Sequence, residues 1–80
     1  LPILEKSGYK RGNETRGVLA LKEMLIIAKA RKLHNVTLDE NSIFGEGTEK
    51  AVNALLKKWG YKQNSVAGEK FIKKLASAIK

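Results

Sequence analysis

The sequence predicts an all-α protein, a small three-helix bundle with an irregular N-terminal arm. Apolar residues recur at three- and four-residue steps in three separate segments, which is the spacing of a helix that buries one face. No segment favours a substantial sheet, and a short turn sequence occurs twice, each time directly before an apolar periodic segment. Eighty residues suffice for a single domain, in which we expect an arm at 1–12 and a helical core at 13–80.

The start of the chain lacks helical periodicity. Residues 1–12 contain the only proline and a glycine on each side of Tyr9, which indicates turns. The apolar residues expected to dock on the bundle are Leu1, Ile3 and Leu4. The first helix should follow, capped by Asn13 or Thr15 and ending near residue 33. Because glycine weakens a helix, Gly17 leaves open a start just after it.

Two apolar stripes run along this first helix, so it is expected to contact neighbours on two sides. The first stripe consists of Val18, Leu21, Leu25 and Ala28. The second stripe consists of Leu19, Ile26, Ala30 and Leu33. Residues 34–38 then break the periodicity and can carry a short extended stretch at most.

A duplicated six-residue sequence organises the second half of the chain. NSIFGE at 41–46 returns 23 residues later as NSVAGE at 64–69. Asn-Ser favours a turn, the following Ile43 or Val66 is expected to point inward, glycine permits a tight backbone, and glutamate is favoured at a helix N-terminus. Each copy is therefore predicted to be a loop that begins a helix.

The second and third helices should follow these two loops. The second is expected at residues 46–59 or 48–59, with Gly60 as the residue that ends it. Its inward-facing residues are Ala51, Val52, Leu55, Leu56 and Trp59. The third is expected at residues 69–79, and its inward-facing residues are Phe71, Ile72, Leu75, Ala76 and Ile79.

The charge distribution places an acidic loop on a basic chain. The formal net charge is +8, yet residues 38–47 hold Asp39, Glu40 and Glu46 and no basic residue. Such a surface attracts polyanions, which include nucleic acid, anionic lipid and the phosphate-rich polymers of bacterial walls. For any single lysine, a solvated surface that keeps a small domain soluble explains the charge equally well. The absence of cysteine excludes disulfides and thiolate metal sites.

The spacing of several elements resembles one known family. The elements are V-x-x-L-x-x-x-L at 18–25, N-S-I-F-G-x-x-T-x-x-A-V-x-x-L at 41–55, G-Y at 60–61 and N-S-V-A-G at 64–68. Together they resemble the pattern of the peptidoglycan-binding domain family over nearly the whole chain, and the most specific part is F-G-x-x-T-x-x-A-V at 44–52. The chain departs from that pattern where the family has two Asp-Gly pairs, here Asn-Ser, and two glutamines, here Lys22 and Leu56.

The resemblance implies a non-catalytic module that binds bacterial peptidoglycan or an associated anionic wall polymer. In that family such a module targets a covalently linked wall-lytic enzyme, for example an N-acetylmuramoyl-L-alanine amidase or a phage endolysin. The resemblance also implies an extracellular protein of the bacterial cell wall, or a phage-encoded one that acts on the host wall. A chain that begins at Leu1 rather than methionine agrees with a module of a longer protein.

A glycan ligand needs an aromatic platform with amide or hydroxyl partners nearby. We therefore expect a shallow ligand-binding groove, formed by Asp39, Asn41, Thr48, Trp59 and Tyr61. Phe44 and Phe71 sit in the apolar pattern and are expected in the core. Trp59 continues the apolar stripe of its helix, yet it lies at the helix end, where one edge of the ring can stay in water. The alternative interpretation is that Asn41 and Thr48 only close the turn and cap the helix.

The chain offers little for catalysis or metal binding, and no cofactor is expected. His34 is the only histidine and Asp39 the only aspartate, so neither a Ser-His-Asp triad nor a pair of aspartates can form. His34, Asp39 and Glu40 could in principle ligate a metal, but no second histidine and no helical HExxH spacing supports such a site. A solvated loop is the favoured interpretation.

Two alternative functions belong to other classes. A small basic helical domain can bind DNA or RNA, although lysines far outnumber arginines here and no helix-turn-helix pattern stands out. EKFIKKLASAIK at 69–80 has the pattern of a cationic amphipathic helix at a membrane surface, but the core of the bundle explains its apolar stripe better. Nucleic acid and membrane are therefore not the expected partners.

Overall fold

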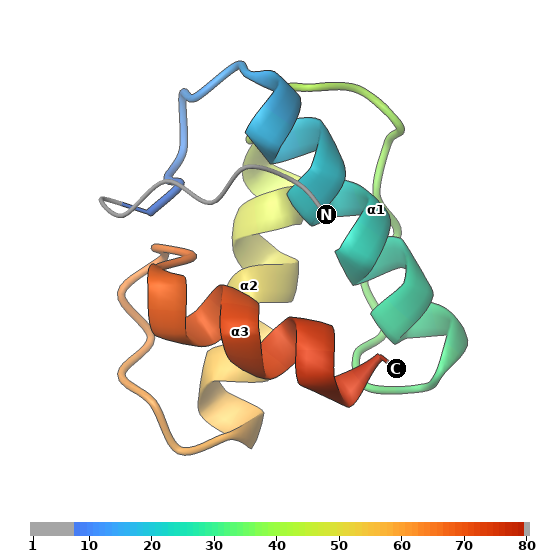
Figure 1. The fold of residues 1–80 in the computed structure, drawn as a ribbon, viewed down its shortest axis with the longest axis vertical. Coiled ribbons are helices and arrows are strands. Elements are labelled where there is room, and N and C mark those ends of the chain that lie inside the picture. Colours follow the sequence, from blue (N-terminus) through green and yellow to red (C-terminus); the bar gives the residue numbers. More distant parts are fainter. Residues whose placement is uncertain (1–7, 80) are drawn as a thin grey trace.

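The computed structural model describes residues 8–79 and contains three helices packed around one core (Figure 1). They are α1 (Arg16–Ala30), α2 (Glu46–Lys58) and α3 (Glu69–Ala78). Two isolated β-bridges occur within residues 8–79, which otherwise contain no strand. The predicted all-α, three-helix architecture is therefore confirmed. The expected docking of Leu1, Ile3 and Leu4 concerns residues outside the described part of the chain.

All three helices and both repeat loops contribute to the core. The first stripe of α1 is buried throughout, as predicted, and α1 contacts both α2 and α3. The second stripe is only half-buried, and Ala30 is exposed. The buried apolar residues are Tyr9, Val18, Leu21, Met24, Leu25, Ala28, Phe44, Ala51, Val52, Leu55, Leu56, Ala67, Phe71, Ile72 and Leu75.

The start of α1 is fixed by a cap and by one aromatic ring. Thr15 is the N-cap, and its hydroxyl accepts a hydrogen bond from the Val18 amide at 3.2 Å. The helix begins at Arg16, so Gly17 lies inside it rather than before it. The ring of Tyr9 occupies the space that a side chain at position 17 would need, because a Cβ there would overlap the Tyr9 hydroxyl. This close approach accounts for a glycine within a helix.

The end of α1 differs from the prediction, which extended the helix to residue 33. Lys32 adopts a left-handed conformation with φ 64°, and the chain turns there. The Leu33 amide donates to the Ala28 carbonyl at 2.9 Å, and the Lys32 amide donates to the Lys29 carbonyl at 2.9 Å. This pair of hydrogen bonds is the Schellman motif, which usually places glycine at the left-handed position. Because lysine does not mark the end of a helix in a sequence, this end of α1 was not predicted.

The end of α2 uses the same motif with the usual residue. Gly60 has φ 79°, and Trp59 is the C-cap. The Tyr61 amide donates to the Leu56 carbonyl at 2.7 Å, and the Gly60 amide donates to the Lys57 carbonyl at 3.2 Å. The predicted role of Gly60 as the residue that ends the second helix is confirmed.

Both copies of the repeat form the same side-chain hydrogen bond before a helix, although Ser65 of the second copy is left-handed, with φ 63°, and Ser42 of the first is not. The Asn41 side chain accepts a hydrogen bond from the Ile43 amide at 3.0 Å, and the Asn64 side chain accepts one from the Val66 amide at 3.1 Å. Such side-chain turns are the reason asparagine favours this position. The glycine of each copy is the N-cap, and the glutamate is the first helical residue. Each copy therefore begins a helix, as predicted.

The residue that each copy turns inward is not the one predicted. Ile43 is 47% exposed, whereas the next residue, Phe44, is 1% exposed. In the second copy Val66 is half-buried, and again the next residue, Ala67, is fully buried. The expectation that Ile43 and its counterpart point inward is wrong, whereas the expectation that Phe44 lies in the core is confirmed. The reason lies outside the repeat, in the segment that pairs with it.

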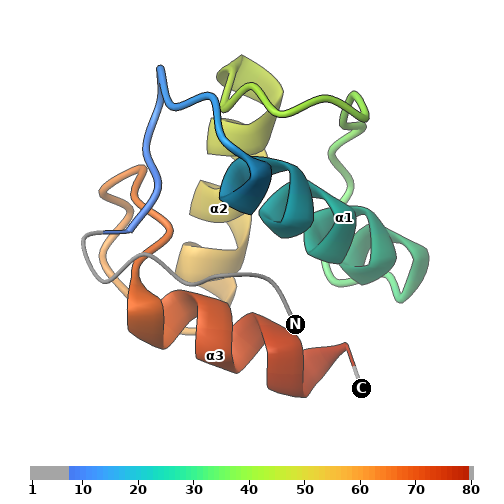
Figure 2. The same cartoon turned by 45° about the horizontal axis from the view of Figure 1, so that its top comes forward.

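Residues 9–13 form hydrogen bonds with both repeat loops. Tyr9 and Ala67 exchange two backbone hydrogen bonds of 3.0 and 2.8 Å. Further along, the Phe44 amide donates to the Asn13 carbonyl at 2.8 Å and its carbonyl accepts from the Gly12 amide at 3.1 Å. In Figure 2 this segment, in blue, runs from the loop before α3 to the start of α1. Because the pairing fixes which face of each loop is inward, Phe44 and Ala67 are buried.

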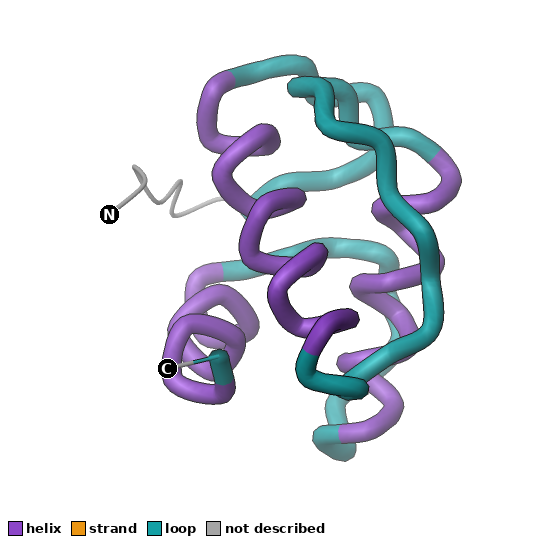
Figure 3. Tube along the Cα trace, turned by 90° about the vertical axis from the view of Figure 1, so that its right-hand side faces the viewer, coloured by secondary structure: helices purple, strands orange, loops and turns teal. Residues whose placement is uncertain are grey.

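The long connection between α1 and α2 returns along the side of α1 (Figure 3). His34 anchors it, because its ring is buried and both ring nitrogens make hydrogen bonds. Nδ1 accepts from the Val36 amide at 3.0 Å, so Nε2 carries the hydrogen and donates to the Leu25 carbonyl at 2.7 Å. His34 is thus a structural residue and not part of a solvated loop. The anchored connection delivers Asp39 and Asn41 to the start of α2.

Candidate functional site

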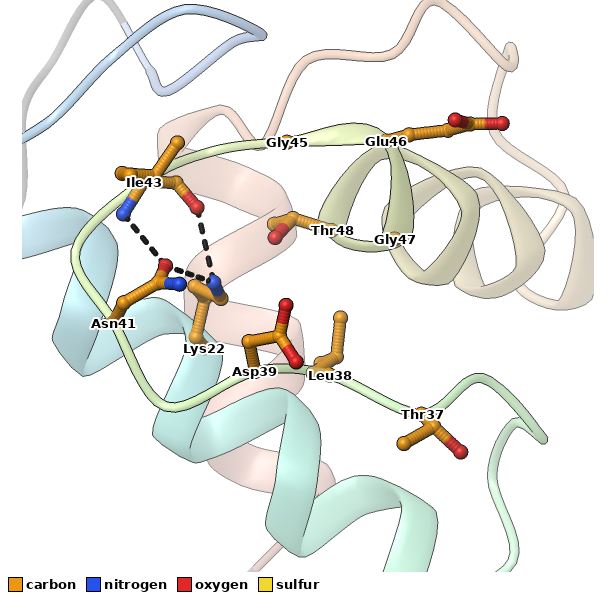
Figure 4. Close-up of a pocket in the computed structure, with 10 residues that line it drawn as sticks. All are labelled: Lys22, Thr37, Leu38, Asp39, Asn41, Ile43, Gly45, Glu46, Gly47 and Thr48. Atoms are coloured by element: carbon orange, nitrogen blue, oxygen red, sulfur yellow. Dashed lines mark hydrogen bonds between the residues drawn. The ribbon is translucent and has the colours of Figure 1, made fainter.

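An open pocket lies where the connection from α1 meets the first turn of α2 (Figure 4). Its volume is about 390 Å³. Three of the five predicted site residues line it, namely Asp39, Asn41 and Thr48. The other lining residues are Lys22, Thr37, Leu38, Ile43, Gly45, Glu46 and Gly47. We call this space the Lys22 pocket.

Lys22 forms one wall of the pocket, although it comes from α1. The residue is only 3% exposed, and its ammonium donates to the Asn41 side-chain oxygen at 2.6 Å and to the Ile43 carbonyl at 3.0 Å. Both acceptors are uncharged, and within residues 8–79 no carboxylate forms an ion pair with this ammonium. Buried charges in proteins are normally paired, because removing a charge from water costs several kcal/mol. Lys22 is therefore an unusual feature of the core.

Asn41 connects this ammonium to the loop. Its single side-chain oxygen accepts from the Lys22 ammonium and from the Ile43 amide, so the same atom closes the turn and holds the lysine. Figure 4 shows both hydrogen bonds converging on Asn41. Asn41 therefore closes the turn, as the alternative interpretation states, and it also binds the Lys22 ammonium. In the sequence Lys22 stands out only as a departure from a family glutamine, and its contact with Asn41 was not predicted.

The remaining polar groups of the pocket come from the loop and from α2. Figure 4 shows the Asp39 carboxylate and the Thr48 side chain pointing into the space, while Glu46 points away from it. Thr48 is buried and lies in the first turn of α2, where it does not cap the helix, because Gly45 is the N-cap and no side chain caps it. The first amides of α2 have no acceptor within the helix. They add a partial positive charge to this end of the pocket.

Trp59 and Tyr61 lie at the other end of α2. Thr48 and Trp59 are eleven residues apart along one helix, a separation of about 16 Å at the usual rise per residue. The structure therefore does not bring all five predicted residues into one groove. Tyr61 is 43% exposed and borders a second pocket of about 470 Å³. The other residues lining that pocket are Leu56, Lys62, Asn64, Val66, Gly68, Glu69, Lys70 and Phe71.

Trp59 is mainly a packing residue. Its ring lies 5.6 Å from the ring of Phe71, measured between centroids, and the Lys74 ammonium lies 5.9 Å from the Trp59 ring centroid. These contacts join the end of α2 to α3 and leave Trp59 half-buried. A role for any of the five residues in ligand binding stays a prediction.

The three-helix fold has a counterpart among solved structures. It is similar to the crystal structure of the SleB N-terminal domain, with a TM-score of 0.76 and 24% sequence identity. The likeness covers 98% of this chain and 100% of that domain. No protein-family model and no curated protein matches the chain. At this identity the likeness establishes a shared fold.

Several acidic residues of the described chain form ion pairs at its surface. Residues 8–79 contain no group of three His, Cys, Asp or Glu side chains placed to hold a metal ion. Glu46 and Glu69 each pair with the lysine four residues later, at 3.4 and 3.2 Å, and Glu49 pairs with Arg11 at 3.7 Å. Such exposed pairs contribute about 0.5 kcal/mol each or less.

No helix in residues 8–79 has the length and apolar character needed to cross a membrane.

Proposed function

We propose that this chain is a non-catalytic module that binds bacterial peptidoglycan. The observation that carries the proposal is the sequence F-G-x-x-T-x-x-A-V at 44–52, whose named apolar residues and threonine are all buried around the start of α2. The fold shared with the SleB N-terminal domain supports it. This pattern matches the family in its spacing and also forms one wall of a polar pocket. It therefore indicates the function more specifically than the fold alone does.

The module would target a covalently linked wall-lytic enzyme to its substrate, for instance an N-acetylmuramoyl-L-alanine amidase or a phage endolysin. It would then act outside the cell, on the wall of the producing bacterium or of a phage host. The net charge of +8 favours binding to a wall in which peptidoglycan is accompanied by anionic polymers. Electrostatic attraction of this kind raises the rate of encounter more than it sets specificity.

Two surfaces are available to a long polymer. The Lys22 pocket supplies Asp39, Asn41 and Thr48, which are polar groups suited to a peptide or an amide. The second pocket has a largely apolar lining and presents the exposed ring of Tyr61, which suits the apolar face of a sugar. A polymer that contacts both surfaces would run along α2, so the five predicted residues would act at two subsites. Trp59 would support the second subsite through its packing on α3.

Co-sedimentation with purified sacculi tests the proposal. We expect the domain to pellet with sacculi at moderate salt and to remain bound when the salt concentration is raised. Binding to duplex DNA or to anionic vesicles, measured in parallel, should be weaker and should vanish at high salt. Failure to pellet with sacculi from any wall type would contradict the proposal.

A small basic helical domain that binds nucleic acid is the alternative. The observation that favours it is the set of exposed lysines at the last turn of α2, in the loop that follows and along α3. They are Lys57, Lys58, Lys62, Lys70, Lys73 and Lys74. In that case the affinity for duplex or single-stranded DNA would exceed that for sacculi and would fall steeply with salt.

A further inference from the structure

We propose that the Lys22 pocket binds a free amino-acid end, meaning a carbon atom that carries both an ammonium and a carboxylate. In a bacterial wall such an end occurs on a stem peptide that contains diaminopimelate and is not cross-linked through its distal amine. The inference rests on the proposed function and deepens it, because it names the part of the polymer that this pocket takes. Two side chains of opposite charge that face the pocket, Lys22 and Asp39, support this inference.

The positive side of the pocket is a buried ammonium with an incomplete set of partners. Lys22 is 3% exposed and donates to the oxygen atoms of Asn41 and Ile43, so two of its three N–H groups are used. Within residues 8–79 no acceptor receives the third N–H and no carboxylate balances the charge. The two hydrogen bonds hold the ammonium at the pocket wall. A ligand carboxylate would supply both the missing acceptor and the missing negative charge.

The negative side is the carboxylate of Asp39. It points into the same space and is exposed, and within the described residues it forms no ion pair, with Lys22 or with any other cation. Glu46, whose side chain points away, is already paired with Lys50 at 3.4 Å. Asp39 is therefore the carboxylate available to a ligand ammonium. One small group that carries both charges would satisfy Lys22 and Asp39 together.

The remaining features of the pocket disfavour other wall components. No aromatic side chain lines it, so the apolar face of a sugar ring would find no platform there. A phosphate polymer carries negative charge alone, and Asp39 at the pocket would repel it. The volume of about 390 Å³ is near the lower end of the range of about 300–1,000 Å³ for small-molecule pockets. A single amino-acid end fits within this volume and is the component that matches the two charges.

Titration of the isotopically labelled domain, followed by NMR, tests the inference directly. The probe is N-acetyl-L-alanyl-γ-D-glutamyl-meso-diaminopimelate, whose distal carbon is the only free amino-acid end. We expect amide shifts at residue 22 and at residues 37–48. Two analogues serve as matched controls: one replaces diaminopimelate with lysine, which lacks the distal carboxylate, and the other is acetylated on the distal amine. Each should bind roughly tenfold or more weakly, as expected for the loss of one charge-assisted contact.

Two substitutions place the binding at these residues. Asp39→Asn keeps the shape of an exposed side chain and removes its charge, and Lys22→Met keeps the unbranched stem in the core and removes the ammonium. Both should weaken binding of the tripeptide roughly tenfold or more. Lys58→Gln, which removes an exposed lysine at the other end of α2, is the control and should leave binding within about twofold. Because Asp39 is exposed, its variant stays informative even if the core variant is disturbed.

The results separate this inference from the proposed function. Equal binding of the probe and its analogues, unchanged binding by the Asp39→Asn variant, or shifts confined to the surroundings of Tyr61 would overturn the inference. If the domain pellets with sacculi in that case, wall binding stands and uses another surface. If the tripeptide binds in the pocket while sacculi are not bound, the inference stands and the proposed function fails.

Discussion

Lys32 and Gly60 occupy the same position at the ends of two helices, each as the left-handed residue of a Schellman motif. Their φ angles are 64° and 79°, and the hydrogen bonds around them correspond one to one. A side chain costs about 1–2 kcal/mol in this conformation, whereas glycine has no such cost. The C-terminal end of α1 is therefore less stable than that of α2, because it has lysine where α2 has glycine.

Replacement of Lys32 by glycine should consequently stabilise the domain by about 1 kcal/mol. Urea denaturation followed by circular dichroism measures the change. Ala30→Gly, at an exposed helical position two residues earlier, is the matched control and should destabilise by about 0.5–1 kcal/mol. A loss of stability in both variants would show that Lys32 makes a favourable contact of its own.

Gly17→Ala should destabilise the domain, against the usual gain for this substitution inside a helix. The added methyl group would overlap the hydroxyl and ring of Tyr9, and displacing that buried ring should cost about 1–3 kcal/mol. Gly47→Ala in the first turn of α2 is the control, because its nearest neighbour would lie at 3.4 Å, which requires only a small adjustment. Equal thermal stability of the two variants would argue against the close packing of Tyr9 on α1.

The two repeat asparagines permit a measurement of the Lys22 hydrogen bond. Asn64→Ala removes only a turn hydrogen bond, whereas Asn41→Ala removes the same bond and also an acceptor of the buried ammonium. We expect Asn41→Ala to cost about 1–3 kcal/mol more than Asn64→Ala, because it leaves a buried charge with one partner fewer. In a Lys22→Met background this excess should disappear. An excess that persists there would trace to the loop itself.

Tyr61→Ala and Trp59→Ala should have different effects, although both rings are near the end of α2. Tyr61 is exposed, so its loss should change stability by less than about 0.5 kcal/mol and weaken sacculus binding. Trp59 packs on Phe71, so its loss should cost about 2 kcal/mol of stability as well. Sedimentation with sacculi and thermal unfolding of the same preparations check both expectations. Unchanged sacculus binding by the Tyr61 variant would exclude the second subsite.

The helices were predictable because their signals are local. Apolar spacing located all three, and Thr15 and Gly60 mark ends that depend only on neighbouring residues. The end of α1 was not predictable, since Lys32 adopts a conformation that its side chain disfavours. Phe44 was expected in the core from the apolar pattern, but the exposure of Ile43 was not predictable, because the loop pairs with residues 12 and 13, far away in the sequence. Such non-local pairing leaves no pattern in the repeat itself.

The site was predictable only in part for a related reason. Asp39, Asn41 and Thr48 come together because one loop and the following helical turn contain them all. The rise per residue of a helix already separates Thr48 from Trp59 by about 16 Å, so the sequence alone could have excluded one groove that contains both residues. Lys22 was missed because its partner Asn41 is nineteen positions away. A lysine beside an apolar stripe is a signal that could have drawn attention to it.

The exchange of hydrogen bonds between Tyr9 and Ala67 ties the first described residues to the last loop before α3. Closing so long a stretch of chain is entropically costly, and the pairing must await the synthesis of residue 67. During synthesis on the ribosome the first two helices can therefore form while the segment at residues 9–13 stays without one of its partners. The core, which includes the buried Ala67, can then be completed only after the second repeat loop has emerged.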